Sequence, residues 1–236
     1  MNYTDEKKKS NPFIVEIEGE MKELEINKAY CIGYAGRIKE KTWEHVKELA
    51  EIGVPEPEEV PSLYPVSTSS LSHRQNIEVI GDKTSGEAEI VLIFGNSSNE
   101  VYVTVGSDHT DRSLETVDIN KSKQVCDKPF AAKAWSFETV KGHWDQLELS
   151  SQIYLNGEWV DYQKDTIDAI LPYEEIKEYL IQKNVPLQNS IVFSGTVPLL
   201  DGFKYGDKFR MVFSDPTNGD QITAEYEINN LIDKGV

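Results

Sequence analysis

The sequence predicts an α+β fold that is mainly β, with a few helices packed on one sheet-rich core. Two observations predict it. From residue 77 to residue 228, short apolar and β-branched runs alternate with turns rich in Gly, Asn, Asp and Pro. By contrast, only residues 40–53 and 172–184 have a convincing helical period. The 236 residues are 39% hydrophobic and 28% charged, which is ordinary for a globular chain with a sizeable core.

The first part of the chain predicts strands followed by a helix. Residues 12–18 (PFIVEIE) alternate in strand fashion, and the next segment continues with a hairpin-like rhythm. The helix over 40–53 places its apolar side chains on one face and ends at a glycine. We expect residues 1–60 to form a strand–helix section packed on a main domain of residues 61–236.

The rest of the chain predicts a loop, a series of strands and a second helix. Residues 54–70 are rich in Pro and Ser, which favours a loop. The helix over 172–184 has a proline near its start and acidic residues in its first turn. Asn156–Gly157 is typical of a hairpin turn. The strand candidates are residues 77–80, 89–95, 101–106, 147–155, 191–197, 209–213 and 224–228.

The charge of the chain excludes some functions. With 41 acidic and 24 basic residues the net charge is −17, which repels nucleic acids and anionic membrane surfaces. An anionic substrate would need a metal ion or clustered Lys and Arg. The two cysteines, Cys31 and Cys126, make neither a disulfide framework nor a zinc site. With no apolar leader and no membrane-length apolar run, a cytoplasmic location is expected.

Two acidic residues precede the most apolar strand candidate. In the stretch GEAEIVLIFG, Glu87 and Glu89 are two positions apart, so both side chains point to the same face of a strand. The following residues are apolar on both faces, which indicates a strand covered on both sides. A solvated strand start is the common explanation of such acids. The alternative is a divalent metal site, which requires a third oxygen ligand.

Asp108 is the candidate for that third ligand. The strand candidate over 101–106 ends just before it, and a hairpin-like segment joins this strand to the one over 89–95. Antiparallel pairing would bring Asp108 close to Glu87 and Glu89. Oxygen ligands alone suit Mg²⁺ or Mn²⁺, whereas no His or Cys spacing supports zinc.

Other polar residues fit a site for a carboxylate substrate. Arg112 and Lys123 are suited to binding a carboxylate, although each alone is more often a surface base. Residues 194–196 (Ser-Gly-Thr) end a strand candidate and offer small groups and backbone N–H donors. His45 and Glu48 are three apart on the predicted helix, an arrangement typical of a general base but also of an ordinary surface pair.

Taken in their order along the chain, the polar segments described above resemble those of the fumarylacetoacetate hydrolase superfamily. The similarity spans residues 31–228 and includes GEAEIVLI, GSDHTDR, SKQVCDKP, SGTVP and LDGFKYGDKFRMVF. It implies metal ligands Glu87, Glu89 and Asp108, substrate contacts Arg112, Gly195 and Thr196, and catalytic residues His45, Glu48 and Lys123.

The resemblance also implies a fold and a function. The fold is a mixed β-roll or β-sandwich with a few peripheral helices, usually dimeric. The function is a Mg²⁺- or Mn²⁺-dependent hydrolase that cleaves a carbon–carbon bond of a 2-oxo or 1,3-dicarbonyl acid through a metal-stabilised enolate. The same site would serve a decarboxylase, dehydratase or isomerase, and a non-catalytic organic-acid-binding protein is a further alternative.

The chain departs from the superfamily pattern around the substrate pocket. Ser107 replaces the family's Asn, Glu115 stands where a glutamine is frequent, and Asp108 follows Glu89 by 19 positions, a shorter interval than usual. These differences indicate a divergent branch with its own substrate.

Overall fold

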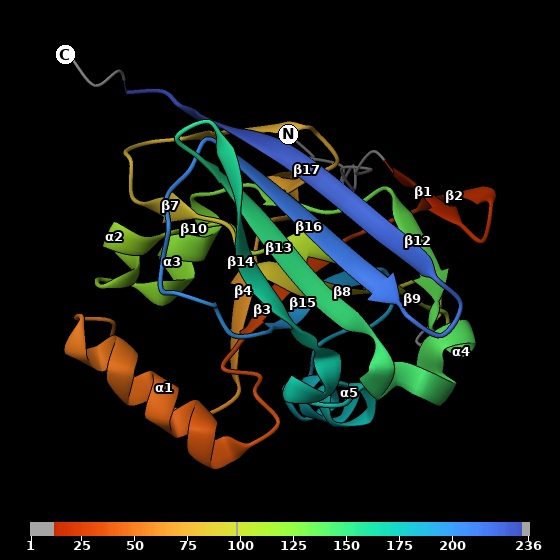
Figure 1. Ribbon diagram of the computed structural model, residues 1–236. Coiled ribbons are helices and arrows are strands. Elements are labelled where there is room, and N and C mark those ends of the chain that lie inside the picture. The colour runs from red at the N-terminus through yellow and green to blue at the C-terminus, as the bar shows by residue number, and fades with distance from the viewer. Residues whose placement is uncertain (1–11, 98, 233–236) are drawn as a thin grey trace, which may run out of the picture.

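Two β-sheets account for most of the computed structural model, which describes residues 12–97 and 99–232. The larger sheet has the order β2-β1-β12-β9-β8-β15-β3-β4, and the smaller has the order β14-β13-β16-β17-β6. Figure 1 shows the strands of the smaller sheet crossing in front of the larger one. This is the mainly-β α+β fold that the sequence predicts.

The strand bounds are as follows. The larger sheet contains β1 (Phe13–Ile17), β2 (Glu20–Leu24), β3 (Lys28–Gly33), β4 (Ser62–Val66), β8 (Ala88–Phe94), β9 (Val101–Ser107), β12 (Lys133–Ser136) and β15 (Ser190–Thr196). The smaller contains β6 (Asn76–Val79), β13 (Glu148–Leu155), β14 (Glu158–Thr166), β16 (Lys208–Asp215) and β17 (Asp220–Asn230). Two-residue strands form two further pairs, β7 (Thr84–Ser85) with β10 (Thr110–Asp111) and β5 (Leu71–Ser72) with β11 (Lys128–Pro129).

Strand β8 is buried on both faces, as its apolar sequence predicts. Ile90 and Leu92 belong to the core between the two sheets, together with residues of β13 and β16. Val91 and Ile93 point the other way, into a second apolar cluster. That cluster also holds residues of β1 and β4, which lie near opposite ends of the sheet order, so the larger sheet curls over its own second face. The result is a β-roll packed against a second sheet.

Both predicted helices are confirmed, and three short ones are new. Helix α1 (Lys39–Glu51) begins one residue before the predicted range of 40–53 and ends inside it, and helix α5 (Tyr173–Gln182) lies within the predicted 172–184. The short helices are α2 (Arg112–Glu115), α3 (Ile119–Gln124) and α4 (Phe137–Val140). With four to six residues they are too short for a helical period to appear in the sequence.

The prediction of a loop over residues 54–70 is partly wrong. Strand β4 lies inside this segment and pairs with β3 in antiparallel register. It is the last strand of the larger sheet, where Pro65 costs no ladder hydrogen bond to a further neighbour. The Asn156–Gly157 hairpin is confirmed, because β13 and β14 pair on either side of it and both residues have positive φ.

The N-terminal strands share the sheet of the later ones. Strand β1 pairs with β12, and β3 pairs with β15, so residues before position 60 complete the larger sheet. The division of the chain at residue 60 stays a prediction. Within the described ranges, none of the helices combines the length and apolar character needed to cross a membrane.

Candidate functional site at one edge of the larger sheet

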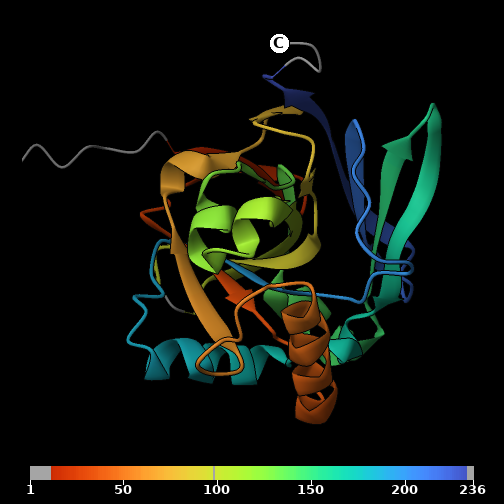
Figure 2. The same cartoon turned by 90° about the vertical axis from the view of Figure 1, so that its left-hand side faces the viewer.

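The acidic residues of interest lie where three strands of the larger sheet begin or end. Glu89, at the start of β8, is paired with Gly106 of β9 and with Thr196 at the end of β15. The backbone N–H of Asp108 donates to the carbonyl of Glu87 at 3.0 Å, so the hairpin places Asp108 beside the Glu-x-Glu segment as predicted. Helices α2 and α3 cover this end of the molecule, as Figure 2 shows.

Glu89 is a buried carboxylate with few partners. Its side chain lies on the inner face of the roll, and the residue is 3% exposed. The described residues give it one hydrogen bond, from the backbone N–H of Gly195 at 3.3 Å. Burial raises the pKa of Glu89 well above its ordinary value, and the negative charges of Asp108 and Glu87 raise it further. A carboxylate in this position is stabilised by either a proton or a nearby cation.

Gly195 can approach Glu89 because it has no side chain. Its φ is +132°, which L side chains rarely adopt, and an added Cβ would lie 2.8 Å from Ala35 and 2.9 Å from Ile170. The glycine therefore allows the backbone to face the carboxylate.

Asp108 is fully buried but well paired. Lys123 donates to its Oδ2 at 2.5 Å, and the Nζ of Lys128 lies 3.4 Å from its Oδ1. Burial alone would raise the pKa of Asp108, but the two lysines outweigh burial and lower the pKa to about 2. The structure thus joins the predicted metal ligand to the predicted active-site lysine.

Lys128 is a functional candidate that sequence reasoning missed. It is fully buried, and its ammonium group donates to the backbone carbonyls of His109 at 2.7 Å, Cys126 at 3.0 Å and Lys123. It therefore fixes the segment that carries Lys123 to the segment that carries Asp108. A lysine within the otherwise apolar run KPFAA was the available signal.

Arg112 lies beside Glu87 and is held by protein groups. Its Nε donates to Ser85 Oγ at 2.7 Å, and one terminal nitrogen donates to Glu87 at 3.2 Å. The other terminal nitrogen donates to both oxygens of Glu115, at 3.1 and 3.0 Å. Ser85 and Glu115 were not among the predicted site residues. The spacing of Arg112 and Glu115 fits an i,i+3 ion pair, but the helix that creates it is too short to recognise in sequence.

Thr196 has its hydroxyl engaged within the protein. It donates to the carbonyl of Ala88 at 2.6 Å and accepts from the side-chain amide of Gln163 at 2.5 Å. The Gln163 carbonyl oxygen in turn accepts from the backbone N–H of Ala88 at 2.9 Å and from Ser151 at 2.7 Å. Gln163 belongs to β14, so one amide connects the smaller sheet to the site edge, and no sequence pattern indicated it.

The predicted His45–Glu48 pair forms on helix α1. His45 Nδ1 lies 3.3 Å from Glu48 Oε2, and the side chains are 59% and 74% exposed. The hydrogen bonds and ion pairs of the described residues do not join this pair to the buried acids. Its catalytic role stays a prediction.

The charged residues at this edge form one group, called here the edge cluster. Its members are Glu87, Glu89, Asp108, Arg112, Glu115, Lys123 and Lys128. Ion pairs hold Asp108 and Glu87 to basic residues. In the described part of the chain, no three His, Cys, Asp or Glu side chains are arranged to hold a metal ion.

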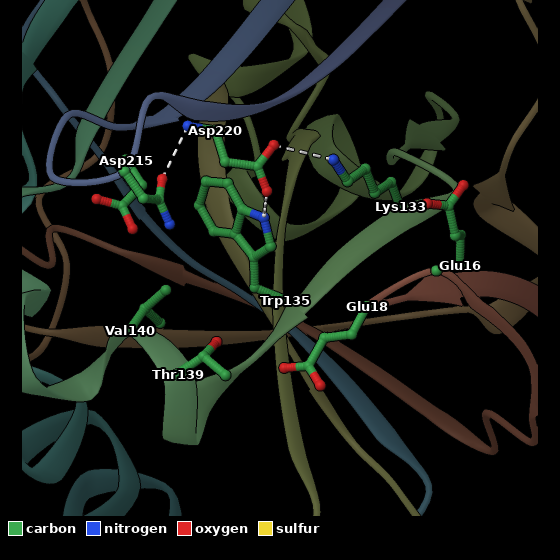
Figure 3. A pocket seen from close by; sticks show the side chains of 10 residues that line it. Glu16, Glu18, Lys133, Trp135, Thr139, Val140, Asp215 and Asp220 are labelled. Atoms are coloured by element: carbon green, nitrogen blue, oxygen red, sulfur yellow. Dashed lines mark hydrogen bonds and ion pairs between the residues drawn. The ribbon is translucent and has the colours of Figure 1, made fainter.

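A second acidic region lies at the other end of the sheets and is called here the acidic pocket. It has a volume of about 310 Å³ and is lined by Glu16, Glu18, Gly19, Lys133, Trp135, Thr139, Val140, Asp215, Asn218 and Asp220. Figure 3 shows Asp220 between Lys133 and Trp135, which donate to it at 3.1 and 3.0 Å. The pocket contains no member of the edge cluster.

Solved structures share this fold. Cg1458 is 15% identical with a TM-score of 0.63, over 89% of this chain and 79% of that one. 2-Keto-3-deoxy-D-arabinonate dehydratase is 17% identical with a TM-score of 0.63, over 90% and 77%. Fumarylpyruvate hydrolase from Pseudomonas aeruginosa, solved with Mn²⁺ and pyruvate, is 18% identical with a TM-score of 0.59, over 94% and 97%.

These likenesses confirm the predicted fold, which is that of fumarylacetoacetate hydrolase-like proteins. None of the curated proteins matches the chain. A family model described as "Protein of unknown function (DUF2848)" matches residues 32–226, and the chain therefore belongs to this family.

Proposed function

We propose that the chain is a metal-dependent enzyme of the fumarylacetoacetate hydrolase superfamily that cleaves a carbon–carbon bond in a 2-oxo or 1,3-dicarbonyl acid. The observation that carries the proposal is the edge cluster, in which Glu89 is buried beside Asp108 and Glu87 with one backbone hydrogen bond. The names of the structural neighbours, a fumarylpyruvate hydrolase and a 2-oxo acid dehydratase among them, support the same class of chemistry.

The edge cluster fits Mg²⁺ or Mn²⁺ in its chemistry. Glu87, Glu89 and Asp108 supply the oxygen donors that these ions prefer. Burial first, and then the negative charges of Asp108 and Glu87, raise the pKa of Glu89, and a nearby cation would favour its ionised form. The ion pairs with Arg112 and Lys123 use one oxygen each, Oε2 of Glu87 and Oδ2 of Asp108, so the ion would bind the other oxygen of each carboxylate or displace these partners.

Each residue of the site then has a role in holding substrate or moving a proton. When bound, the ion would supply Lewis-acid polarisation of the ketone and carboxylate oxygens of a 2-oxo acid. Lys123 and the amino group of Arg112 that donates to Glu87 would bind the carboxylate beside the ketone, with Gly195 and Thr196 as further substrate contacts. His45, oriented by Glu48, would remove a proton from water.

A second candidate is a decarboxylase, dehydratase or isomerase of 2-oxo acids. The exposure of His45 and Glu48 favours it, because these reactions do not depend on a water molecule activated by helix α1. A third candidate, a binding protein without turnover, would be stabilised by an organic acid and form no product.

The test is a screen of 2-oxo and 1,3-diketo acids with Mn²⁺ and with EDTA, read by product formation. Metal-dependent release of two organic fragments, neither of which is CO2, supports the hydrolase. If His45→Ala turns over at the wild-type rate while Glu89→Gln is inactive, the second candidate replaces it. Ligand-induced stabilisation with no product from any acid supports the binding protein. A homodimer, also proposed, is checked by sedimentation velocity.

A further inference from the structure

Arg112 is poorly placed to bind a substrate carboxylate with its full fork. Its Nε and one terminal nitrogen are occupied by Ser85 and by both oxygens of Glu115. The ring of Phe203 lies over the guanidinium group, with 4.4 Å from the ring centroid to Cζ. Even if Glu87 turned to a metal ion, only the terminal nitrogen that now binds Glu87 would be released. A bidentate grip on a second, distal carboxylate is therefore blocked by Glu115.

The charge balance of the edge cluster points the same way. Among its members, the four carboxylates of Glu87, Glu89, Asp108 and Glu115 outnumber the three cationic side chains by one. A divalent ion would reverse this to one positive charge, which a single substrate carboxylate neutralises. A second carboxylate would restore a net negative charge in a buried site, and any approach to Arg112 would bring it toward the negative charge of Glu115.

Aromatic side chains lie beside two basic residues of the edge cluster. The ammonium group of Lys123 is 5.7 Å from the centre of the Tyr64 ring. With Phe203 beside Arg112, these rings offer apolar faces to an uncharged tail.

We propose that the site selects 2-oxo acids with one carboxylate and an uncharged tail, and that Glu115 sets this preference by occupying Arg112. The inference rests on the proposed function and narrows its substrate class. Removing the charge of Glu115 replaces an ion pair with Arg112 by at most one neutral hydrogen bond and removes the repulsion, so a distal carboxylate becomes acceptable.

The test measures binding by calorimetry in the presence of Mn²⁺, without reference to turnover. The probes are 2-oxopentanoate and 2-oxoglutarate, which have the same number of carbon atoms and differ by the distal carboxylate. We expect wild-type protein to bind 2-oxopentanoate more tightly by about tenfold or more. In Glu115→Gln the difference in affinity between the two acids disappears or reverses. The control is Glu138→Gln, which changes net charge equally but alters an exposed side chain of helix α4 and keeps the wild-type preference.

Wild-type protein that binds 2-oxoglutarate as tightly as 2-oxopentanoate overturns the inference, and this comparison holds even if Glu115→Gln fails to fold. An unchanged ratio in a folded Glu115→Gln protein also overturns it. In both cases the proposed function stands, because a 2-oxo acid is bound. If neither acid binds to any of the proteins, the proposed function fails and the inference fails with it.

Discussion

The edge cluster and the acidic pocket both gather carboxylates, but they treat them differently. In the acidic pocket, burial alone would raise the pKa of Asp220, yet hydrogen bonds from Lys133 and Trp135 outweigh burial and lower it. In the edge cluster, burial raises the pKa of Glu89 and its acidic neighbours raise it further. In the acidic pocket, partners at the surface compensate the charge of Asp220. In the edge cluster, Glu89 is buried with too few partners to compensate its charge.

This difference shows which property of an acidic region indicates function. The number of acidic residues in a region does not indicate function, because clusters of acidic residues are expected by composition on a chain of net charge −17. A buried carboxylate that its neighbours leave uncompensated is costly for folding, and sites for cations commonly carry that cost.

The largest expected effect is on stability when a buried ion pair is broken. Lys123→Met leaves Asp108 buried with less compensation and should lower the free energy of unfolding by about 3–5 kcal/mol. Lys133→Met breaks the exposed pair with Asp220 and should cost about 0–1 kcal/mol. Urea denaturation compares them, and equal costs would remove the contrast between the two regions.

The next effect is on metal binding. Glu89→Gln removes the least compensated oxygen donor and should weaken Mn²⁺ binding by about 100-fold or more, beyond the 10- to 100-fold typical of outer partners of a metal site. Asp220→Asn, the matched change in the acidic pocket, should leave Mn²⁺ binding unaltered. Calorimetry decides, and equal affinities for wild type and Glu89→Gln would contradict the metal site.

A third comparison uses one glycine from each region. In Gly195→Ala the alanine would have an unfavourable φ, and its Cβ would overlap the side chains of Ala35 and Ile170. In Gly19→Ala the φ of +84° is also unfavourable, but no atom lies within 4 Å of the added Cβ. The overlap should make Gly195→Ala the more destabilising change by about 2 kcal/mol. Thermal unfolding measures the difference, and the reverse order would show that the Gly195 backbone is not tightly packed.

The smallest effects concern pH, with any metal removed by EDTA. The folded-state pKa of Glu89 is raised, so its contribution destabilises the protein as pH rises above about 4.3, and Glu89→Gln should lose less stability toward neutral pH than wild type. The folded-state pKa of Asp220 is lowered, so its contribution is present above about 3.9 and disappears as pH falls. Asp220→Asn should therefore be slightly less stable than wild type at pH 7 and equal to it in strong acid. If the stabilities of the two variants relative to wild type changed with pH in the same direction, the opposite signs expected for Glu89 and Asp220 would be refuted.

Much of the fold follows from sequence, because the signals are local. Strand β8 is an unbroken apolar run, and helix α1 has a clear period. Strand β4 contains Pro65 and escapes recognition, since its place at the sheet edge depends on the whole sheet. The proximity of Asp108 to the Glu-x-Glu segment was predictable from one hairpin.

The partners of the site were harder to predict. Lys128 reaches carbonyls of two segments, and Gln163 comes from the opposite sheet, so both depend on tertiary packing. Glu115 was visible only as a departure from a family pattern. Its contact with Arg112 needed the three-dimensional structure.

Gln163 has a consequence for how the molecule moves. Its amide is bound to the start of β8, to the end of β15 and to Ser151 of β13, so it crosses the space between the two sheets. Any sliding of one sheet over the other must pull on the backbone next to Glu89. The position of the smaller sheet is therefore coupled to the geometry of the site. We expect mutations in distant parts of its strands to change the spacing of the carboxylates.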